Sequence, residues 1–387
     1  MTDTPKPAPE TIAAAHGVAR DTAFGAVAPP LYLSTTYAFE GYERAGRYDY
    51  GRSGNPNRDT LGEALAALEG GAGAVVTSSG MAAIDLLLGL HGPDDLIVAP
   101  HDCYGGTYRL LAARAAKRQF RLTFVDQSDE AALAAVLGDK PALVLIESPS
   151  NPLMRVVDIR AIADAAHAAG ARVAVDNTFL SPAAQQPLSL GADYVLHSTT
   201  KFLNGHSDVI GGAVIAADPG EVERLRHWAN VVGVAGAPFD SWLTLRGLRT
   251  LFARMERQQR NAQIVAEWLA ARPEVSAVHY PGLATHPGHA IARAQQTGFG
   301  AMLSFDLAGG AAAAKRLAEA IGTFTLAESL GGVESLIAHP ATMTHADMGD
   351  EARRVAGIGD GLLRLSIGLE HPDDLIAGLD QGFAALR

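Results

Sequence analysis

Short, nearly continuous apolar segments recur through the middle of the chain and constrain its fold more than any other feature. They are residues 74–78, 96–100, 121–126, 142–148, 171–177, 193–198 and 210–216. Helix-like stretches separate most of them. Strands that are apolar along their whole length and alternate with helices are typical of a parallel sheet covered on both faces. The sequence therefore predicts an α/β fold with a mostly parallel, seven-stranded sheet.

The segments on either side of this region have different patterns. Residues 1–60 contain Pro, Gly, Tyr and Arg without a sustained period, which indicates an irregular arm, and the first ten are expected to be frayed. Residues 250–270 have the pattern of a long helix, and strand-like segments follow at 275–280, 301–307 and 362–368. We therefore expect an arm (1–60), a large α/β domain (61–255) and a smaller α+β domain (256–387).

Charge and cysteine content exclude several classes of protein. The net charge is −11 with scattered Lys and Arg, so the chain lacks the basic surface that binds nucleic acid or an anionic membrane. No apolar run approaches the roughly 18–20 residues of a membrane span, and residues 1–10 lack the apolar core of a signal peptide. The single cysteine, Cys103, excludes an intrachain disulfide and a thiolate metal cluster. We expect a cytoplasmic enzyme.

Small polar residues follow two of the predicted strands. Ser79, Gly80 and Met81 come after the first strand and open a helix. The start of a helix offers backbone N–H groups and a favourable dipole to a phosphate. Ser198 and Thr200 flank the turn after another strand and can add two hydroxyl donors. Because ligands of an open parallel sheet bind outside the carboxyl ends of its strands, these residues predict a phosphate site.

An acidic and a basic residue stand at the ends of two other strands. Asp176 ends the segment 171–177, and Lys201 follows the segment 193–198. A carboxylate can keep a pyridine nitrogen protonated, and an amine can form an imine with an aldehyde. With a phosphate site, these are the protein groups that pyridoxal phosphate (PLP) requires. Taken singly, each has an ordinary explanation as a turn, a helix cap or a solvated side chain, so the prediction rests on their combination.

Motifs for other kinds of active site are missing from the sequence. No G-x-G-x-x-G follows a predicted strand, and neither G-x-x-x-x-G-K-[ST], H-E-x-x-H nor G-x-S-x-G occurs. His286 and His289 stand in a Pro/Gly-rich segment, so we expect them at the surface rather than on a metal. The usual support for an NAD, P-loop, zinc or serine-hydrolase site is therefore absent.

Several motifs resemble the PLP-dependent enzymes of cysteine and methionine metabolism. They are Ser79-Gly80-Met81 and the segments 101–110, 147–153, 175–182, 197–208 and 328–335, in the same order along the chain from about Ala28 onward. The resemblance implies PLP as cofactor and fold type I, the fold of aspartate aminotransferase. The segments 101–110, 233–251 and 298–305 are most similar to the bacterial members that synthesise cystathionine.

The resemblance also implies how the cofactor is held. Lys201 would bind it as an imine and move protons, Asp176 would pair with the pyridine nitrogen, and Tyr104 would stack on the ring as a possible acid or base. The cofactor-binding residues would be Ser79, Gly80, Met81, Thr178, Ser198 and Thr200, together with Tyr50 and Arg52 of a neighbouring subunit. The arm would thus contact a neighbour within a homotetramer built from two dimers.

For the substrate, the resemblance implies a site centred on one arginine. Arg364 would bind the α-carboxylate through its two-pronged guanidinium, with Ser329 close to this carboxylate and to the lysine. Asn151, Glu328 and Arg109 complete the expected substrate-binding set.

The implied reaction is a γ-replacement in methionine biosynthesis. O-Succinylhomoserine, or another O-acylhomoserine, exchanges its acyloxy group for the thiol of L-cysteine, which yields L-cystathionine and succinate. Ser53 stands where some of these synthases have a second arginine and γ-lyases often have a small residue. Cleavage of cystathionine to cysteine, ammonia and 2-oxobutyrate is therefore the alternative. A third hypothesis is a cofactor-binding protein with little turnover. The presence of all three of Lys201, Asp176 and Tyr104 argues against it.

Overall fold

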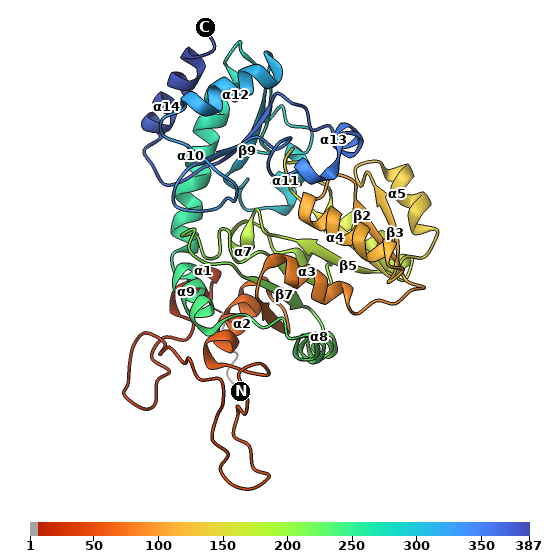
Figure 1. Cartoon of the computed structure of the whole chain (residues 1–387), viewed down its shortest axis with the longest axis vertical. Helices are drawn as coiled ribbons and strands as arrows, with labels where there is room; N and C mark the ends of the chain where they lie inside the picture. The colour runs from red at the N-terminus through yellow and green to blue at the C-terminus, as the bar shows by residue number, and fades with distance from the viewer. Residues whose placement is uncertain (1–6) are drawn as a thin grey trace.

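Seven strands form a sheet in the order β1-β7-β6-β5-β4-β2-β3 in the computed structural model, which describes residues 7–387 (Figure 1). The strands are β1 (Gly73–Thr77), β2 (Leu96–Pro100), β3 (Arg121–Val125), β4 (Leu143–Glu147), β5 (Arg172–Asp176), β6 (Tyr194–His197) and β7 (Gly212–Ala216). Only β7 runs antiparallel to its neighbours, β1 and β6, while the other pairs in this sheet are parallel. The predicted α/β class and mostly parallel sheet are confirmed.

Helices cover both faces of this sheet. One face packs against α3 (Gly80–Leu88), α4 (Gly105–Ala116) and α8 (Pro219–Val232), and the other against α2 (Pro56–Glu69), α5 (Glu130–Leu137) and α6 (Ile159–Ala168). In β2, Ile97 and Ala99 join the first layer while Leu96 and Val98 join the second. Since successive side chains of a strand point to opposite faces, a strand buried on both faces must be apolar throughout.

A second sheet, in the order β10-β11-β12-β9-β8, forms the C-terminal part. Its strands are β8 (Val275–His279), β9 (Met302–Leu307), β10 (Thr325–Leu326), β11 (Leu336–Ala338) and β12 (Leu362–Ser366). The long helix α10 (Leu251–Ala270), with α12 (Gly310–Ala320) and α14 (Pro372–Ala384), packs on it (Figure 1). The sequence did not predict β10 and β11, because two or three residues are too short to show a periodic pattern.

The remaining elements are short or connect the two sheets. They are α1 (Pro9–Ala15), α7 (Ser181–Ala184), η1 (Pro187–Leu190), α9 (Pro238–Leu248), α11 (His289–Gln295), η2 (Ala346–Met348) and α13 (Asp350–Ala356). None of the helices within residues 7–387 is long and apolar enough to cross a membrane.

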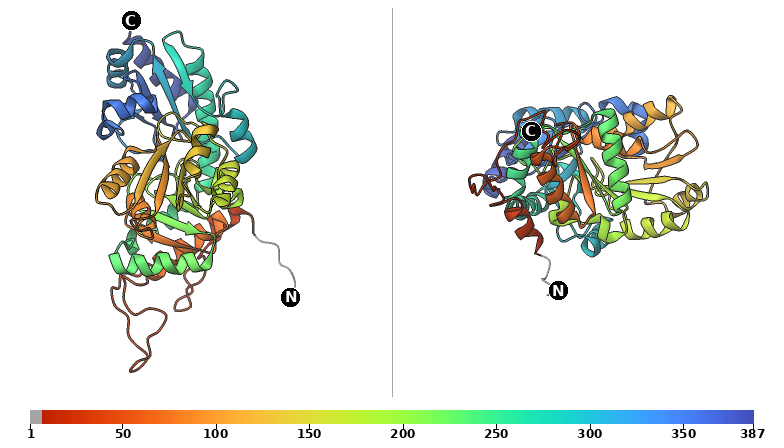
Figure 2. Two further views of the ribbon diagram at one scale, coloured as in Figure 1. Left: turned by 90° about the vertical axis from the view of Figure 1, so that its right-hand side faces the viewer. Right: turned by 90° about the horizontal axis from the view of Figure 1, so that it is seen from below.

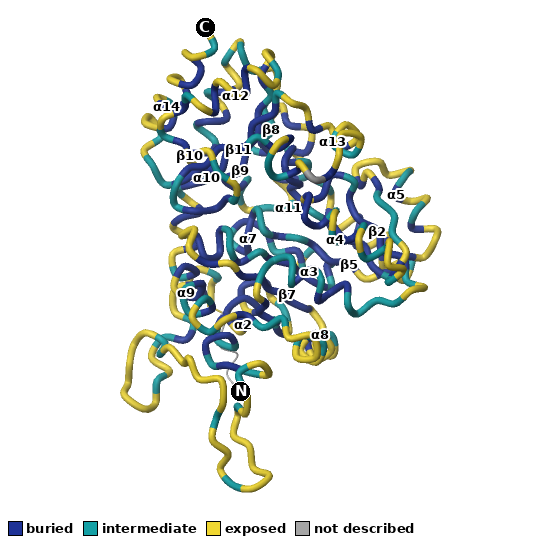
Figure 3. Tube along the Cα trace, viewed as in Figure 1, coloured by how far each residue is buried: buried dark blue, intermediate teal, exposed yellow. Residues whose placement is uncertain are grey.

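The N-terminal arm extends away from the rest of the molecule as irregular loops (Figures 1 and 2). Its exposed surface includes large apolar side chains, among them Phe24, 95% exposed, and Tyr42, 92% exposed. Figure 3 shows the protruding loops of the arm mostly as exposed chain. The expectation of frayed first residues is wrong at Pro9 and Glu10, where α1 begins with proline at its first position. Pro7 and Ala8 are exposed and without regular secondary structure, and residues 1–6 lie outside the described part.

One prediction about the C-terminal part is also wrong. His286 is buried rather than at the surface, because its segment packs against Val156, so closely that a Cβ added to Gly288 would lie 2.7 Å from the Val156 Cβ. The His286 Nδ1 accepts a hydrogen bond from the Gly288 N–H within this segment.

Candidate active site

A cavity of about 880 Å³ lies at the carboxyl ends of β4, β5 and β6, facing residues of the second sheet. It is lined by most of the residues that the sequence analysis selected. These are Ser79, Gly80, Met81, Tyr104, Asn151, Asp176, Thr178, Ser198, Thr200, Lys201, Glu328, Ser329 and Arg364. Residues from six motifs far apart in the chain, together with Arg364, thus share one site.

Lys201 lies just after β6, and its amine reaches toward the second sheet. Its Nζ donates a hydrogen bond to the Ser329 hydroxyl at 2.7 Å. Burial and, to a smaller extent, the nearby Arg364 lower the pKa of Lys201 to about 8, while Glu328 acts in the opposite direction. A lysine with such a pKa is partly neutral near pH 7.5, which makes it a nucleophile toward an aldehyde.

Asp176, the last residue of β5, presents a buried carboxyl group to the same cavity. Burial raises its pKa, and hydrogen bonds from Thr178 act against this rise. One of these bonds comes from the Thr178 N–H to Oδ1 at 3.0 Å, while the Thr178 hydroxyl accepts the Ser198 N–H at 2.9 Å. Thr178 therefore joins the ends of two neighbouring strands. A cationic ring nitrogen is a partner that a carboxyl group in this position can stabilise.

The start of α3 forms another wall of the cavity. The Ser79 hydroxyl caps this helix by accepting the Ala82 N–H at 3.0 Å, as the sequence predicted for a helix start. A Cβ added to Gly80 would lie 2.8 Å from the Ser198 Cβ, so only glycine lets the helix start approach this turn. The Thr200 hydroxyl is held by Gly211, whose N–H it accepts at 3.0 Å. The backbone at the start of α3 and the hydroxyls of Ser198 and Thr200 thus line the same cavity, an arrangement that can bind an anion.

Arg364 enters the cavity from the second sheet. It lies in β12, is 3% exposed, and burial lowers its pKa to about 10. Its Nη1 donates to the Asn151 Oδ1 and its Nη2 to the Ser329 backbone carbonyl, both at 2.9 Å. Ser329 has a φ of 82°, a conformation in which its carbonyl meets Arg364 while its hydroxyl meets Lys201. A guanidinium held in this way can bind a carboxylate.

Tyr104 lies immediately before α4, lines the cavity and is 38% exposed. Its backbone N–H donates to the Glu147 Oε2 at 2.9 Å. Glu147 is the last residue of β4 and was not selected from the sequence, although its position at a strand end is the same signal that identified Asp176.

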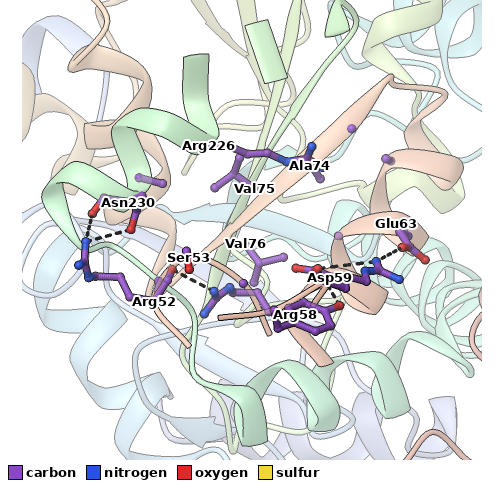
Figure 4. A pocket seen from close by; sticks show the side chains of 18 of the residues that line it. Arg52, Ser53, Arg58, Asp59, Glu63, Ala74, Val75, Val76, Arg226 and Asn230 are labelled. Atoms are coloured by element: carbon purple, nitrogen blue, oxygen red, sulfur yellow. Dashed lines mark hydrogen bonds and ion pairs between the residues drawn. The ribbon is translucent and has the colours of Figure 1, made fainter. Parts of the chain in front are cut away.

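Three of the predicted site residues do not line the cavity. Arg109 lies in α4, and Tyr50, half exposed, belongs to the arm. Arg52 also belongs to the arm, and its Nη1 donates to the Asn230 carbonyl and side-chain oxygens at 2.6 and 2.9 Å (Figure 4). Arg52 and Ser53 line a separate cavity of about 640 Å³ between the arm, α2 and α8. Within one chain, Tyr50 and Arg52 of the arm therefore do not line the cavity that contains Lys201.

Comparisons with known proteins agree with this geometry. Residues 10–384 match the family model described as "Cys/Met metabolism PLP-dependent enzyme". The chain is 57% identical to cystathionine gamma-synthase of Escherichia coli over 376 residues, 97% of both chains. It is 45% identical to cystathionine beta-lyase of Lactococcus lactis over 94% of its own length and 96% of that protein.

The same relationship appears in three dimensions. A crystal structure of cystathionine gamma synthase from Xanthomonas oryzae pv. oryzae in complex with aminoacrylate and cysteine matches with a TM-score of 0.98 and 57% identity, over 99% of each chain. A cystathionine gamma-lyase from Lactobacillus plantarum, complexed with L-serine, matches with a TM-score of 0.95 and 40% identity, over 98% of this chain and 99% of that one. The chain therefore belongs to the family of PLP-dependent enzymes of Cys/Met metabolism, with their fold type I architecture.

Proposed function

We propose that this protein joins an O-acylhomoserine, with O-succinylhomoserine as the first candidate, to L-cysteine, and so forms L-cystathionine and the free acyl carboxylate. The observation that carries this proposal is the single cavity in which Lys201, Asp176, the start of α3 and Arg364 meet. The γ-synthases of Escherichia coli and Xanthomonas oryzae support it further, because these two match the chain at 57% identity and the two lyases above match it at 40–45%.

The residues around the cavity fit PLP. The anion site at Gly80 and Ser198 suits the phosphate, and its two parts can lie this close together because Gly80 has no Cβ to collide with Ser198. Asp176 suits the ring nitrogen, since a buried carboxyl group needs a cationic or hydrogen-bonding partner. Lys201 suits the aldehyde, because its lowered pKa leaves much of the amine uncharged. When bound, PLP supplies an aldehyde that condenses with amines and a ring that withdraws electrons from the attached carbon.

The chain's own side chains would then hold the substrate and move its protons. Arg364 and Asn151 bind the α-carboxylate, which fixes the orientation of the bonds at Cα. The Lys201 Nζ takes the proton from Cα and returns protons along the substrate chain, and the Ser329 hydroxyl keeps this amine in place. The Tyr104 ring, which lines the same cavity, would stack on the cofactor ring and limit the access of water to it. Expulsion of the acyloxy group at Cγ then leaves this carbon open to the cysteine thiol.

We also propose that Tyr50 and Arg52 complete the phosphate site of a neighbouring subunit, in a homotetramer made of two dimers. The exposed apolar side chains of the arm support this idea, because monomeric proteins rarely expose such groups together. Subunits that carry only Lys201→Ala would be mixed with subunits that carry only Arg52→Ala. Partial recovery of activity is expected in the mixed oligomers. If such oligomers form without recovery, the sites are not shared.

The direct test of the reaction is product analysis of the purified, PLP-loaded protein. One sample receives O-succinylhomoserine and cysteine, and another receives cystathionine alone. Much faster formation of cystathionine and succinate in the first sample is expected. Prompt release of 2-oxobutyrate and cysteine in the second, with little synthesis in the first, would instead identify a lyase and explain the small residue Ser53. The cytoplasmic location stays a prediction.

A further inference from the structure

We propose that Glu147 is a positioning residue of this site, an inference that rests on the proposed function. It fixes the backbone of Tyr104, which covers the cofactor ring, and of Asn151, which holds the substrate-binding arginine. It also places a second carboxylate beside Asp176 and thereby favours a positive charge on the ring nitrogen.

The sheet places Glu147 and Asp176 side by side. Glu147 ends β4, Asp176 ends β5, and the two residues are direct partners in the parallel register. Neighbouring strands lie roughly 4.8 Å apart, and paired residues point to the same face of a sheet. Both side chains line the cavity. Behind them lie apolar side chains, Ile84, Leu145 and Leu196.

Each oxygen of the Glu147 carboxylate accepts one backbone N–H. Oε2 accepts from Tyr104 at 2.9 Å, and Oε1 accepts from Asn151 at 2.8 Å. The Asn151 side chain in turn accepts from Arg364. One carboxylate therefore joins the loop before α4 to the loop after β4, and through Asn151 it reaches the second sheet. An amide cannot replace it fully, because its NH₂ group would face one of the two N–H donors.

The surroundings of Glu147 mostly oppose its ionisation. Burial raises the pKa of Glu147 well above its usual range, Asp176 raises it further, and the two N–H bonds oppose this rise. Asp102 adds negative charge nearby, although Arg155 pairs with it at 3.1 Å. The buried Cys103 thiol has a raised pKa, and His197 lowers the pKa of Asp176. A cation placed against this pair counteracts the rise and keeps both carboxyl groups ionised, and the two carboxylates in turn stabilise the cation. A protonated ring nitrogen beside Asp176 is such a cation.

The test compares Glu147→Gln with the wild type, both loaded with PLP. Loss of the charge should move the pH midpoint of the cofactor's visible absorbance downward, by about half a pH unit or more. Loss of one N–H contact should weaken the circular dichroism of the bound cofactor and raise KM for the amino acid by about tenfold. An unchanged midpoint together with unchanged circular dichroism would overturn the proposal.

Two further variants separate this role from a general structural one. Glu147→Asp keeps the charge but is shorter, so the midpoint should return to the wild-type value while the dichroism stays weak. It also serves if the glutamine variant fails to fold. Glu370→Gln is the matched control, because Glu370 also accepts a backbone N–H, that of Ser335, at 2.7 Å and does not line the cavity. It should leave both spectra unchanged.

The spectra require only bound PLP and no turnover. If the wild type forms other products than proposed, the reaction assignment fails while the Glu147 test still gives its own answer. A midpoint that shifts equally in Glu147→Gln and Glu370→Gln would contradict the positioning role.

Discussion

The two sheets contribute to the same cavity in different ways. The large sheet supplies groups that follow the ends of its strands, such as Asp176 and Lys201, and these sit on turns held by local hydrogen bonds. The second sheet supplies Arg364 from within a strand, between Leu363 and Leu365, which are fully buried. A charge in the interior of an apolar strand has little freedom, so its position depends on the packing of that whole sheet.

This difference separates two tasks. In our proposal, the edge of the large sheet holds the cofactor and moves protons, whereas the second sheet binds the carboxylate of the substrate. Contacts between the two regions, such as that from Lys201 to Ser329, couple these tasks. Changes in the first region should therefore alter the chemistry, and changes in the second should mainly alter substrate binding.

The largest effect is expected for Lys201→Ala. Without the amine, the variant loses the covalent link to the cofactor and the group that moves protons, so turnover should fall by at least about 10³-fold. PLP should still bind noncovalently through the anion site and Asp176. Borohydride reduction followed by mass spectrometry measures the covalent link, and product formation measures turnover. Full γ-replacement activity in this variant would exclude the proposed role.

Arg364→Ala should weaken the binding of the substrate and leave the binding of the cofactor intact. Loss of a charge-assisted contact to a carboxylate is expected to raise KM for the amino acid by roughly 10- to 100-fold. PLP should still bind covalently to Lys201, because Arg364 contacts Asn151 and Ser329 rather than the anion site. Lys315→Ala, at an exposed position of α12, is the control. An unchanged KM would contradict the separation of tasks.

The difference between groups at strand ends and a group within a strand also decides what the sequence could predict. Asp176, Lys201 and Ser198 were found from the residues alone, because a parallel sheet brings the ends of its strands to one edge. The bounds of β2 were predicted to the residue, since a strand buried on both faces has a continuous apolar pattern. Arg364 entered only through the family resemblance. The sequence of an apolar strand does not indicate which distant residues its single charged side chain contacts.

Other features escaped prediction for local reasons. Glu147 carried the same strand-end signal as Asp176 but was passed over, since its partners Tyr104 and Asn151 are known only from the structure. His286 was assigned to the surface because its Pro/Gly-rich segment is typical of a loop, yet this loop packs inward. The subunit contacts of the arm stay a prediction.

The lowered pKa of Lys201 predicts how the protein without cofactor takes up PLP. The neutral amine is the reactive form, so the rate of covalent incorporation should rise about tenfold per pH unit below pH 8 and level off above it. Stopped-flow absorbance at a series of pH values measures this rate. A midpoint near 10.5, the value of an ordinary lysine, would mean that burial does not tune this amine.

The smallest effect concerns acid stability where the two regions meet. Burial lowers the pKa of His286 and of His345 to about 4, and His345 also contacts the Asn151 carbonyl. Between pH 6.5 and 4 the unfolded chain therefore binds more protons at these histidines than the folded protein does. Their contribution to stability is intact above pH 6.5 and decreases as the pH falls toward 4.

The raised pKa values of Glu147 and Asp176 act with the opposite sign, because those groups bind protons more readily in the folded state. The wild-type curve sums both effects, so the difference between variants is the decisive quantity. His286→Gln removes one titrating group and should reduce the fall in melting temperature between pH 6.5 and 4 by about 2–4 °C. Thermal unfolding at matched pH values measures this difference. A parallel shift at every pH would mean that the imidazole matters for packing and not for its charge.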